Sequence, residues 1–145
     1  MSNTQLHERF APVFQRIAQG AVQREQERTL AFDAVGWLKH AGFGALRVPR
    51  SQGGLGASLP ELFALLTELG SADSNLPQIV RAHFGFVEGR LVSQDSESQA
   101  YWFPKVVAGQ LWGAAMAERS DTTTNSVTLK PTAAGWQLDG QKYYC

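Results

Sequence analysis

The apolar residues of this sequence keep a helical spacing as far as Gly109 and change to a strand-like pattern after it. Between Leu6 and Val22 they recur every three or four positions, which is the period of a helix with one buried face. The sequence therefore predicts an α+β fold. We expect an amino-terminal helical domain of about five helices over residues 1–109, followed over residues 110–145 by the first strands of an incomplete β-barrel domain.

The best-marked helix is predicted to begin after Ser58. A serine cap, Pro60 in the first turn and Glu61 three residues after the serine are typical of a helix start. The apolar residues expected on its buried face are Leu62, Phe63, Leu66 and Leu69. The glycine-rich loop at 53–56 lacks the spacing of phosphate-binding loops, so close packing is the expected reason for its glycines.

A second helix is predicted from about Leu30 to His40, with Phe32 turned inward. Gly42 stands where a left-handed residue ends a helix. The segment Phe43 to Pro49 is predicted to be extended. A later helix, from about residue 96 to 107, is expected to be interrupted or bent at Pro104.

Two features predict strands after Gly109. The run from Leu111 to Ala117 is continuously apolar and lacks helix caps, which favours a buried strand. Apolar residues then alternate with polar ones on either side of Ala134 and Gly135, as in a β-hairpin. Strands that stop at Cys145 would leave an edge unpaired, so we expect a truncated polypeptide or, alternatively, a natural short protein that finds the missing strands in another chain.

The charge balance and cysteine content exclude several classes of function. Thirteen basic and thirteen acidic residues cancel, so no global field favours nucleic acid or an anionic membrane. The single cysteine, Cys145, excludes an internal disulfide and a multi-cysteine metal site, and no metal site is predicted. No apolar run approaches the roughly 18 residues of a membrane span. We expect a cytoplasmic protein.

Four segments, in this order and spacing, resemble the acyl-CoA dehydrogenase superfamily. They are Ala41-Gly42-Phe43 with Val48-Pro49, Gln52-Gly53-Gly54-Leu55-Gly56, Tyr101 to Gly109, and Asp139-Gly140-Gln141-Lys142. The first three resemble the amino-terminal domain of that family and the proline-containing helix that ends it. The fourth resembles its turn before a flavin-contacting strand.

The resemblance implies a flavin site at the end of the first β strand and in the loop after it. Mapped onto this sequence, the cofactor-binding residues are Met116, Ala117, Glu118, Ser120, Thr122 and Thr124. Donors there would stabilise negative charge on the flavin ring as it accepts electrons. On composition alone, the same loop is a polar connection between strands. Glu118 and Arg119 are a site pair or an exposed ion pair.

Ala117 occupies the position where ordinary acyl-CoA dehydrogenases have a threonine before the glutamate. Together with the segments Asp73-Ser74-Asn75 and Arg81 to Glu88, that departure resembles the monooxygenase branch. This branch includes dibenzothiophene monooxygenase and the sulfur-acquisition oxidoreductases. This branch implies reduced FMN from a separate flavin reductase, a flavin C4a-hydroperoxide, a small organosulfur or related substrate, and a homotetramer. The alternatives are an FAD-dependent acyl-CoA dehydrogenase and a truncated, non-catalytic fragment; the isolated chain is expected to be inactive.

His83 is the candidate catalytic residue, and two interpretations of it stay open. A lone histidine on an apolar helix stripe is typically a hydrogen-bonded core residue, whereas the monooxygenase resemblance implies a hydrogen bond from His83 to the flavin peroxide. The aromatic residues that could wall a substrate pocket, but that are favoured as core, are Phe84, Phe86, Trp102 and Trp112.

Overall fold

The computed structural model describes residues 3–118 and 127–143 of the chain. These residues fall into two compact units, Met1–Trp112 and Gly113–Cys145. We call them the helical unit and the hairpin unit and describe each by itself. No described helix combines the length and the apolar character needed to cross a membrane.

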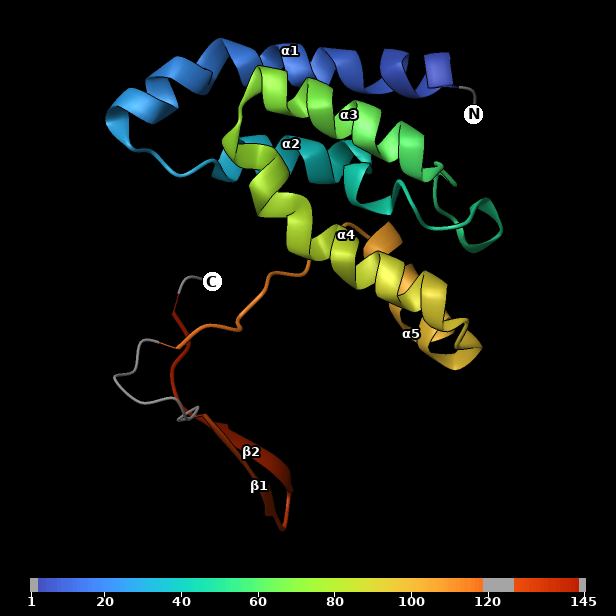
Figure 1. Ribbon diagram of the computed structural model, residues 1–145, viewed down its shortest axis with the longest axis vertical. Coiled ribbons are helices and arrows are strands. Elements are labelled where there is room, and N and C mark those ends of the chain that lie inside the picture. Colours follow the sequence, from blue (N-terminus) through green and yellow to red (C-terminus); the bar gives the residue numbers. More distant parts are fainter. Residues whose placement is uncertain (1–2, 119–126, 144–145) are drawn as a thin grey trace. The chain divides into compact units, whose positions relative to one another are not determined.

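The helical unit contains the five predicted α-helices among its described residues (Figure 1). They are α1 (Asn3–Glu27), α2 (Phe32–Ala41), α3 (Leu59–Ala72), α4 (Asn75–Ser93) and α5 (Ser96–Val107). Two short 3₁₀ turns, η1 (Phe43–Ala45) and η2 (Arg50–Gln52), connect α2 to α3. Helix α1 packs against α2 and α3, α3 packs against α4, and α5 packs against α4 and η1.

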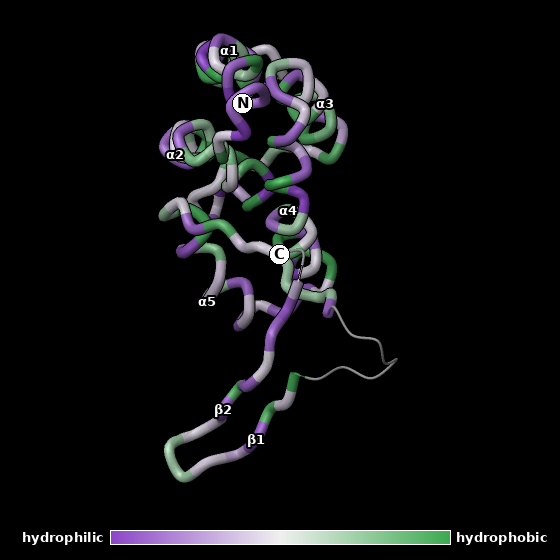
Figure 2. The backbone as a smooth tube through the Cα atoms, turned by 90° about the vertical axis from the view of Figure 1, so that its left-hand side faces the viewer, coloured by the Kyte–Doolittle hydropathy of each residue, from purple (hydrophilic) through white to green (hydrophobic). Residues whose placement is uncertain are grey.

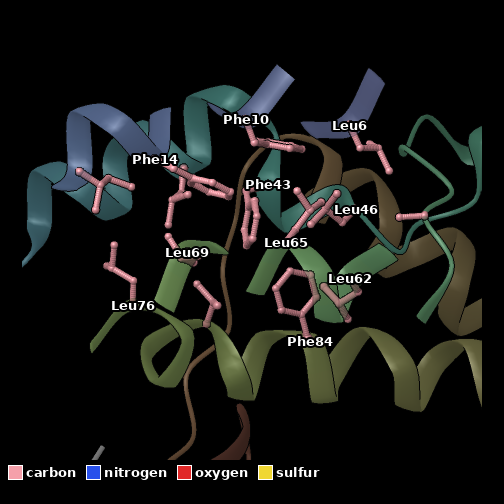
Figure 3. Packing of buried hydrophobic residues seen from close by; sticks show 14 of the residues in the cluster. Leu6, Phe10, Phe14, Phe43, Leu46, Leu62, Leu65, Leu69, Leu76 and Phe84 are labelled. Atoms are coloured by element: carbon pink, nitrogen blue, oxygen red, sulfur yellow. The ribbon is translucent and has the colours of Figure 1, made fainter. Parts of the chain in front are cut away.

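The core of the helical unit is centred on Phe43. Its ring meets the rings of Phe10, Phe14 and Phe84 edge to face, with centroids 5.2, 5.9 and 5.8 Å away. These partners come from α1 and α4, so one side chain of η1 joins two helices (Figure 3). Edge-to-face aromatic pairs contribute about 1 kcal/mol each beyond the burial of their area.

The turn after α2 places Phe43 in this core. Gly42 has φ +80°, the left-handed conformation predicted for it, and its amide donates to the carbonyls of Leu38 and Lys39. The segment after it is not extended, contrary to the sequence prediction. Phe43 begins a 3₁₀ turn, and Leu46 is buried with it on the same side. An extended chain would need a partner strand for its main-chain groups, and none of the described strands pairs with it.

Two phenylalanines predicted to face the core are exposed. Phe32 is 76% exposed because it is the first residue of α2, whose buried face carries Ala34 and Leu38. Phe63 is 63% exposed because α3 buries Leu62 and its helical neighbours at 65 and 69. Hydrophobic and hydrophilic residues follow one another along the helices (Figure 2). Neighbouring positions on one helix differ sharply in burial, as Leu62 and Phe63 do.

Helix α1 continues to Glu27 and contains Pro12. Helix α5 runs from Ser96 to Val107, the predicted bounds, and contains Pro104 without an interruption. In the glycine-rich loop, a Cβ at Gly54 would collide with the carbonyl of Val48, which lies outside the helices, and a Cβ at Gly53 would contact Val107 at the end of α5.

The hairpin unit contains β1 (Thr128–Thr132) and β2 (Gly135–Asp139), paired antiparallel as predicted. Leu129 lies opposite Leu138 and Pro131 opposite Trp136, so these four apolar residues share one face. Both strands are exposed throughout. The predicted strand from Leu111 to Ala117 is wrong, since residues 110–118 have no regular structure. A strand requires a paired neighbour, and the described ladder contains only β1 and β2.

The start of α3 has the predicted capping box. The Ser58 hydroxyl accepts a hydrogen bond from the amide of Glu61, and the Glu61 carboxylate accepts one from the amide of Ser58 at 2.7 Å. Hydrogen bonds from Ser58 lower the pKa of Glu61 below its usual value. At α4 the acceptor for the amide of Asn75 is the Asp73 side chain, whereas Ser74 makes no capping bond.

We expect Ser58→Ala to lower the free energy of unfolding by about 1 kcal/mol, because the amide of Glu61 in the first turn of α3 loses its acceptor. Ser71→Ala is the matched control, since the Ser71 hydroxyl only donates to the carbonyl of Thr67 inside the same helix. Urea unfolding followed by circular dichroism measures both. Equal losses for the two variants would show that the capping box does not stabilise α3.

Candidate functional site

The His83 side chain is buried and bound to main-chain groups on both sides. Its Nε2 lies 2.9 Å from the carbonyl oxygen of Gly44, and its Nδ1 lies 3.4 Å from the amide nitrogen of Trp112. An amide only donates, so Nδ1 accepts and Nε2 carries the proton that is donated to Gly44. Burial lowers the pKa of His83, against the opposing effect of the Gly44 hydrogen bond. This neutral, doubly bonded ring favours the core interpretation of His83.

The predicted aromatic residues pack against one another around His83. Trp112 stacks on His83 at 5.9 Å and on Phe86 at 4.7 Å, and Trp102 meets Trp112 edge-on at 5.6 Å. Phe84 contacts both His83, at 5.3 Å, and Phe43, at 5.8 Å. These contacts favour the core interpretation of the four residues.

The predicted flavin segment is described only at Met116, Ala117 and Glu118. The other predicted cofactor-binding residues, Ser120, Thr122 and Thr124, lie outside the described residues, as does Arg119. Met116 exposes its side chain to solvent. Glu118 forms an ion pair at 2.6 Å with Lys142, and its side chain is only 5% exposed.

Lys142, which follows β2 in the sequence, holds this segment in place. Its ammonium also donates to the Met116 carbonyl at 3.3 Å, and the Tyr143 amide donates to the Ala117 carbonyl at 2.7 Å. The amide of Val127 donates to the Glu118 carboxylate at 3.3 Å. Three stretches of chain therefore meet at one carboxylate. Sequence reasoning missed this role of Lys142, although the turn before it was recognised as a family-like segment.

An apolar hollow that sequence reasoning also missed lies between α3 and α4. Its volume is about 520 Å³. Its lining residues recur at helical spacing on each helix; they are Leu59, Leu62, Phe63, Leu66, Ser74, Pro77, Gln78, Arg81, Phe84, Gly85 and Glu88.

A basic cleft of about 550 Å³ lies at the carboxyl end of α2. Arg9, Lys39 and His40 line it, and the Arg9 guanidinium donates to the Ala41 carbonyl at 2.7 Å. Cations at this end of a helix offset its dipole and its unpaired carbonyls, which accounts for them without a ligand. Within residues 3–118 and 127–143, no group of three or more potential ligands is placed to hold a metal ion.

The buried histidine predicts a pH dependence of stability. Because the pKa of His83 is lowered by folding, the unfolded chain takes up its proton first as the pH falls. The free energy of unfolding should therefore decrease as the pH falls through the unfolded pKa of about 6.5 towards the lower folded pKa. Urea unfolding at several pH values measures this slope.

His83→Phe is the control for that slope, because it removes the titrating group and leaves His7, which contacts Glu68, in both proteins. The variant should be less stable at neutral pH, by about 1–3 kcal/mol for the unpaired Gly44 and Trp112 groups, but less sensitive to pH. An identical pH dependence of the free energy of unfolding in the two proteins would contradict the conclusion that His83 causes it.

The Glu118–Lys142 pair predicts a local effect in the hairpin unit. Lys142→Met leaves a buried carboxylate without its cation, so the amides of Val127 and Tyr143 should exchange with solvent about tenfold faster. The double variant Glu118→Lys with Lys142→Glu should restore part of the protection. Lys130→Met, at an exposed position of β1, is the matched control. Equal effects of the two single variants would refute a special role for Lys142.

Comparison with known proteins places these features in a family. The family model of the acyl-CoA dehydrogenase amino-terminal domain matches residues 5–110. Among proteins with curated functions, none matches the sequence.

Solved structures of TdsC from Paenibacillus sp. A11-2 share the fold. The complex of TdsC with FMN and indole aligns with a TM-score of 0.80 at 24% identity, covering 96% of this chain and 36% of that one. The FMN-bound form aligns with a TM-score of 0.80 at 24% identity, covering 95% of this chain and 35% of that one. The structure described as dibenzothiophene monooxygenase (TdsC) gives 0.77 and 23%, covering 95% and 34%.

The chain thus spans about a third of the length of these structures. At this level of identity the likeness concerns the fold. The family match covers α2 to α5 entirely and nearly all of α1. The chain therefore belongs to the acyl-CoA dehydrogenase family, of which it contains the amino-terminal helical domain.

Proposed function

We propose that the protein is a flavin-dependent oxidoreductase, and that within this class it is a monooxygenase acting on a small organosulfur or related compound. Reduced FMN would come from a separate flavin reductase. The bound flavin would supply the chemistry of oxygen activation. The residues of this chain would hold the ring and shape its surroundings.

The observation that carries the proposal is the fold likeness, which extends through both units to structures that contain FMN. It covers 95–96% of the chain and so includes the segment at Met116–Glu118. An acyl-CoA dehydrogenase amino-terminal domain by itself is compatible with either FMN or FAD chemistry.

The described residues of this segment suit a flavin ring in two respects. Met116 offers an exposed apolar side chain that can lie against a flat ring. The main chain at Ala117 and Glu118 is held by Tyr143 and Lys142, so a ligand would meet a pre-ordered backbone. Ala117 has no hydroxyl to donate towards the ring, which favours the monooxygenase over the dehydrogenase.

Two alternatives remain useful as competing hypotheses. The family model favours an acyl-CoA dehydrogenase with tightly held FAD, because that is the activity for which the family is named. A non-catalytic protein would bind neither flavin. The three hypotheses differ in which flavin is bound and how tightly.

A flavin titration separates them. The purified protein is titrated with oxidised FMN, with reduced FMN under anaerobic conditions, and with FAD. We expect reduced FMN to bind about tenfold more tightly than FAD. Retention of FAD through gel filtration would support the dehydrogenase instead. Absence of saturable binding by any flavin would overturn the proposal.

A further inference from the structure

The hollow between α3 and α4 has an apolar floor, and its rim carries apolar and charged side chains. Leu62 and Phe84 are buried beneath it, whereas Leu59 and Phe63 line it and remain exposed. Phe63 is 63% exposed and adds an apolar ring to the edge of this depression. The volume of about 520 Å³ falls within the usual range for small-molecule sites.

Gly85 keeps this hollow open. It lies inside α4, where glycine is a poor helix former, and a Cβ added there would meet no other atom within 4 Å. Gly85 lines the hollow, so a larger side chain at this position would take up part of that space. The absence of a side chain at position 85 therefore maintains space that a helix of ordinary composition would fill.

The charges at the rim are unequal. The Glu88 carboxylate is neutralised by Arg47, whose Nε lies 2.5 Å away. Arg81 also lines the hollow, and among the described residues no hydrogen bond or ion pair involves its side chain. The rim therefore presents one uncompensated guanidinium beside an apolar surface. A guanidinium binds carboxylate and sulfonate groups through two parallel hydrogen bonds.

We propose that this hollow binds a small molecule with a flat apolar body and one anionic group, such as an aromatic or alkyl carboxylate, sulfinate or sulfonate. The body lies against Phe63 and Phe84, and the anion meets Arg81. As a binding site this stands without flavin chemistry. As the substrate site of an oxygenase it rests on the proposed function.

A pair of dyes tests the two halves of the proposal in flavin-free buffer. Anilinonaphthalene sulfonate carries the anion, whereas uncharged anilinonaphthalene has the same rings without it, and both fluoresce when they enter an apolar site. We expect the sulfonate to bind about tenfold more tightly than the uncharged dye. Arg81→Met should abolish this difference, and Arg81→Lys should retain part of it.

Gly85→Leu fills the hollow and should weaken both dyes by about tenfold or more. Gly89→Leu is the matched control, because Gly89 lies on the same helix, also has free space around its Cβ position and does not line the hollow. Both substitutions replace glycine with a better helix former, so both variants should fold. Phe63→Glu, at an exposed position, gives a second test and should weaken the sulfonate more than the uncharged dye.

Two results would overturn the inference. Unchanged binding in Gly85→Leu and in Phe63→Glu would place the dyes elsewhere, for example on the exposed apolar face of the hairpin. Equal affinities for the charged and uncharged dyes in the wild-type protein would contradict the proposal that Arg81 binds the anionic group. Because no flavin is present, either failure is distinct from failure of the flavin titration.

Discussion

The helical unit depends on the burial of one side chain, Phe43, between α1 and α4. Three aromatic rings meet it edge to face, and the left-handed turn at Gly42 brings it there. Without that turn α2 would continue, and η1 could not join the two helices. The 3₁₀ turn η1 also contains Gly44, whose carbonyl accepts a hydrogen bond from His83 Nε2. The aromatic core and the buried histidine are therefore consequences of a single chain reversal.

Local sequence signals predicted the helices, the caps at Ser58 and Gly42 and the hairpin, because each depends on residues within a few positions of one another. The errors arose where distant contacts decide. Phe63 is exposed because α1 and α4 cover the neighbouring face of α3, and Leu111 to Ala117 is not a strand because no described strand pairs with it. In the candidate site, too, local features could be predicted and distant contacts could not. A resemblance located Glu118, but its partner Lys142 stands 24 positions away and follows from tertiary structure alone.

Two ion pairs of different kind organise the candidate functional regions. Glu118 and Lys142 hold the main chain of the predicted flavin segment, and removal of either charge would leave its partner desolvated. Arg47 and Glu88 neutralise each other beside the hollow. Because Arg47 neutralises Glu88, the guanidinium of Arg81 supplies the net positive charge at the rim of the hollow. The hairpin unit thus has an ordered backbone at the predicted flavin segment. The helical unit has an apolar hollow with the cation of Arg81 at its rim.

The central claim is that flavin is held by the hairpin unit around Met116–Glu118. Hydrogen exchange measured by mass spectrometry, with and without saturating reduced FMN, tests it most directly. The account predicts slower exchange in peptides that cover residues 113–118 and 140–143, and unchanged exchange in α1 to α3. Protection confined to the helices, or no protection at a flavin concentration that saturates binding, would contradict it.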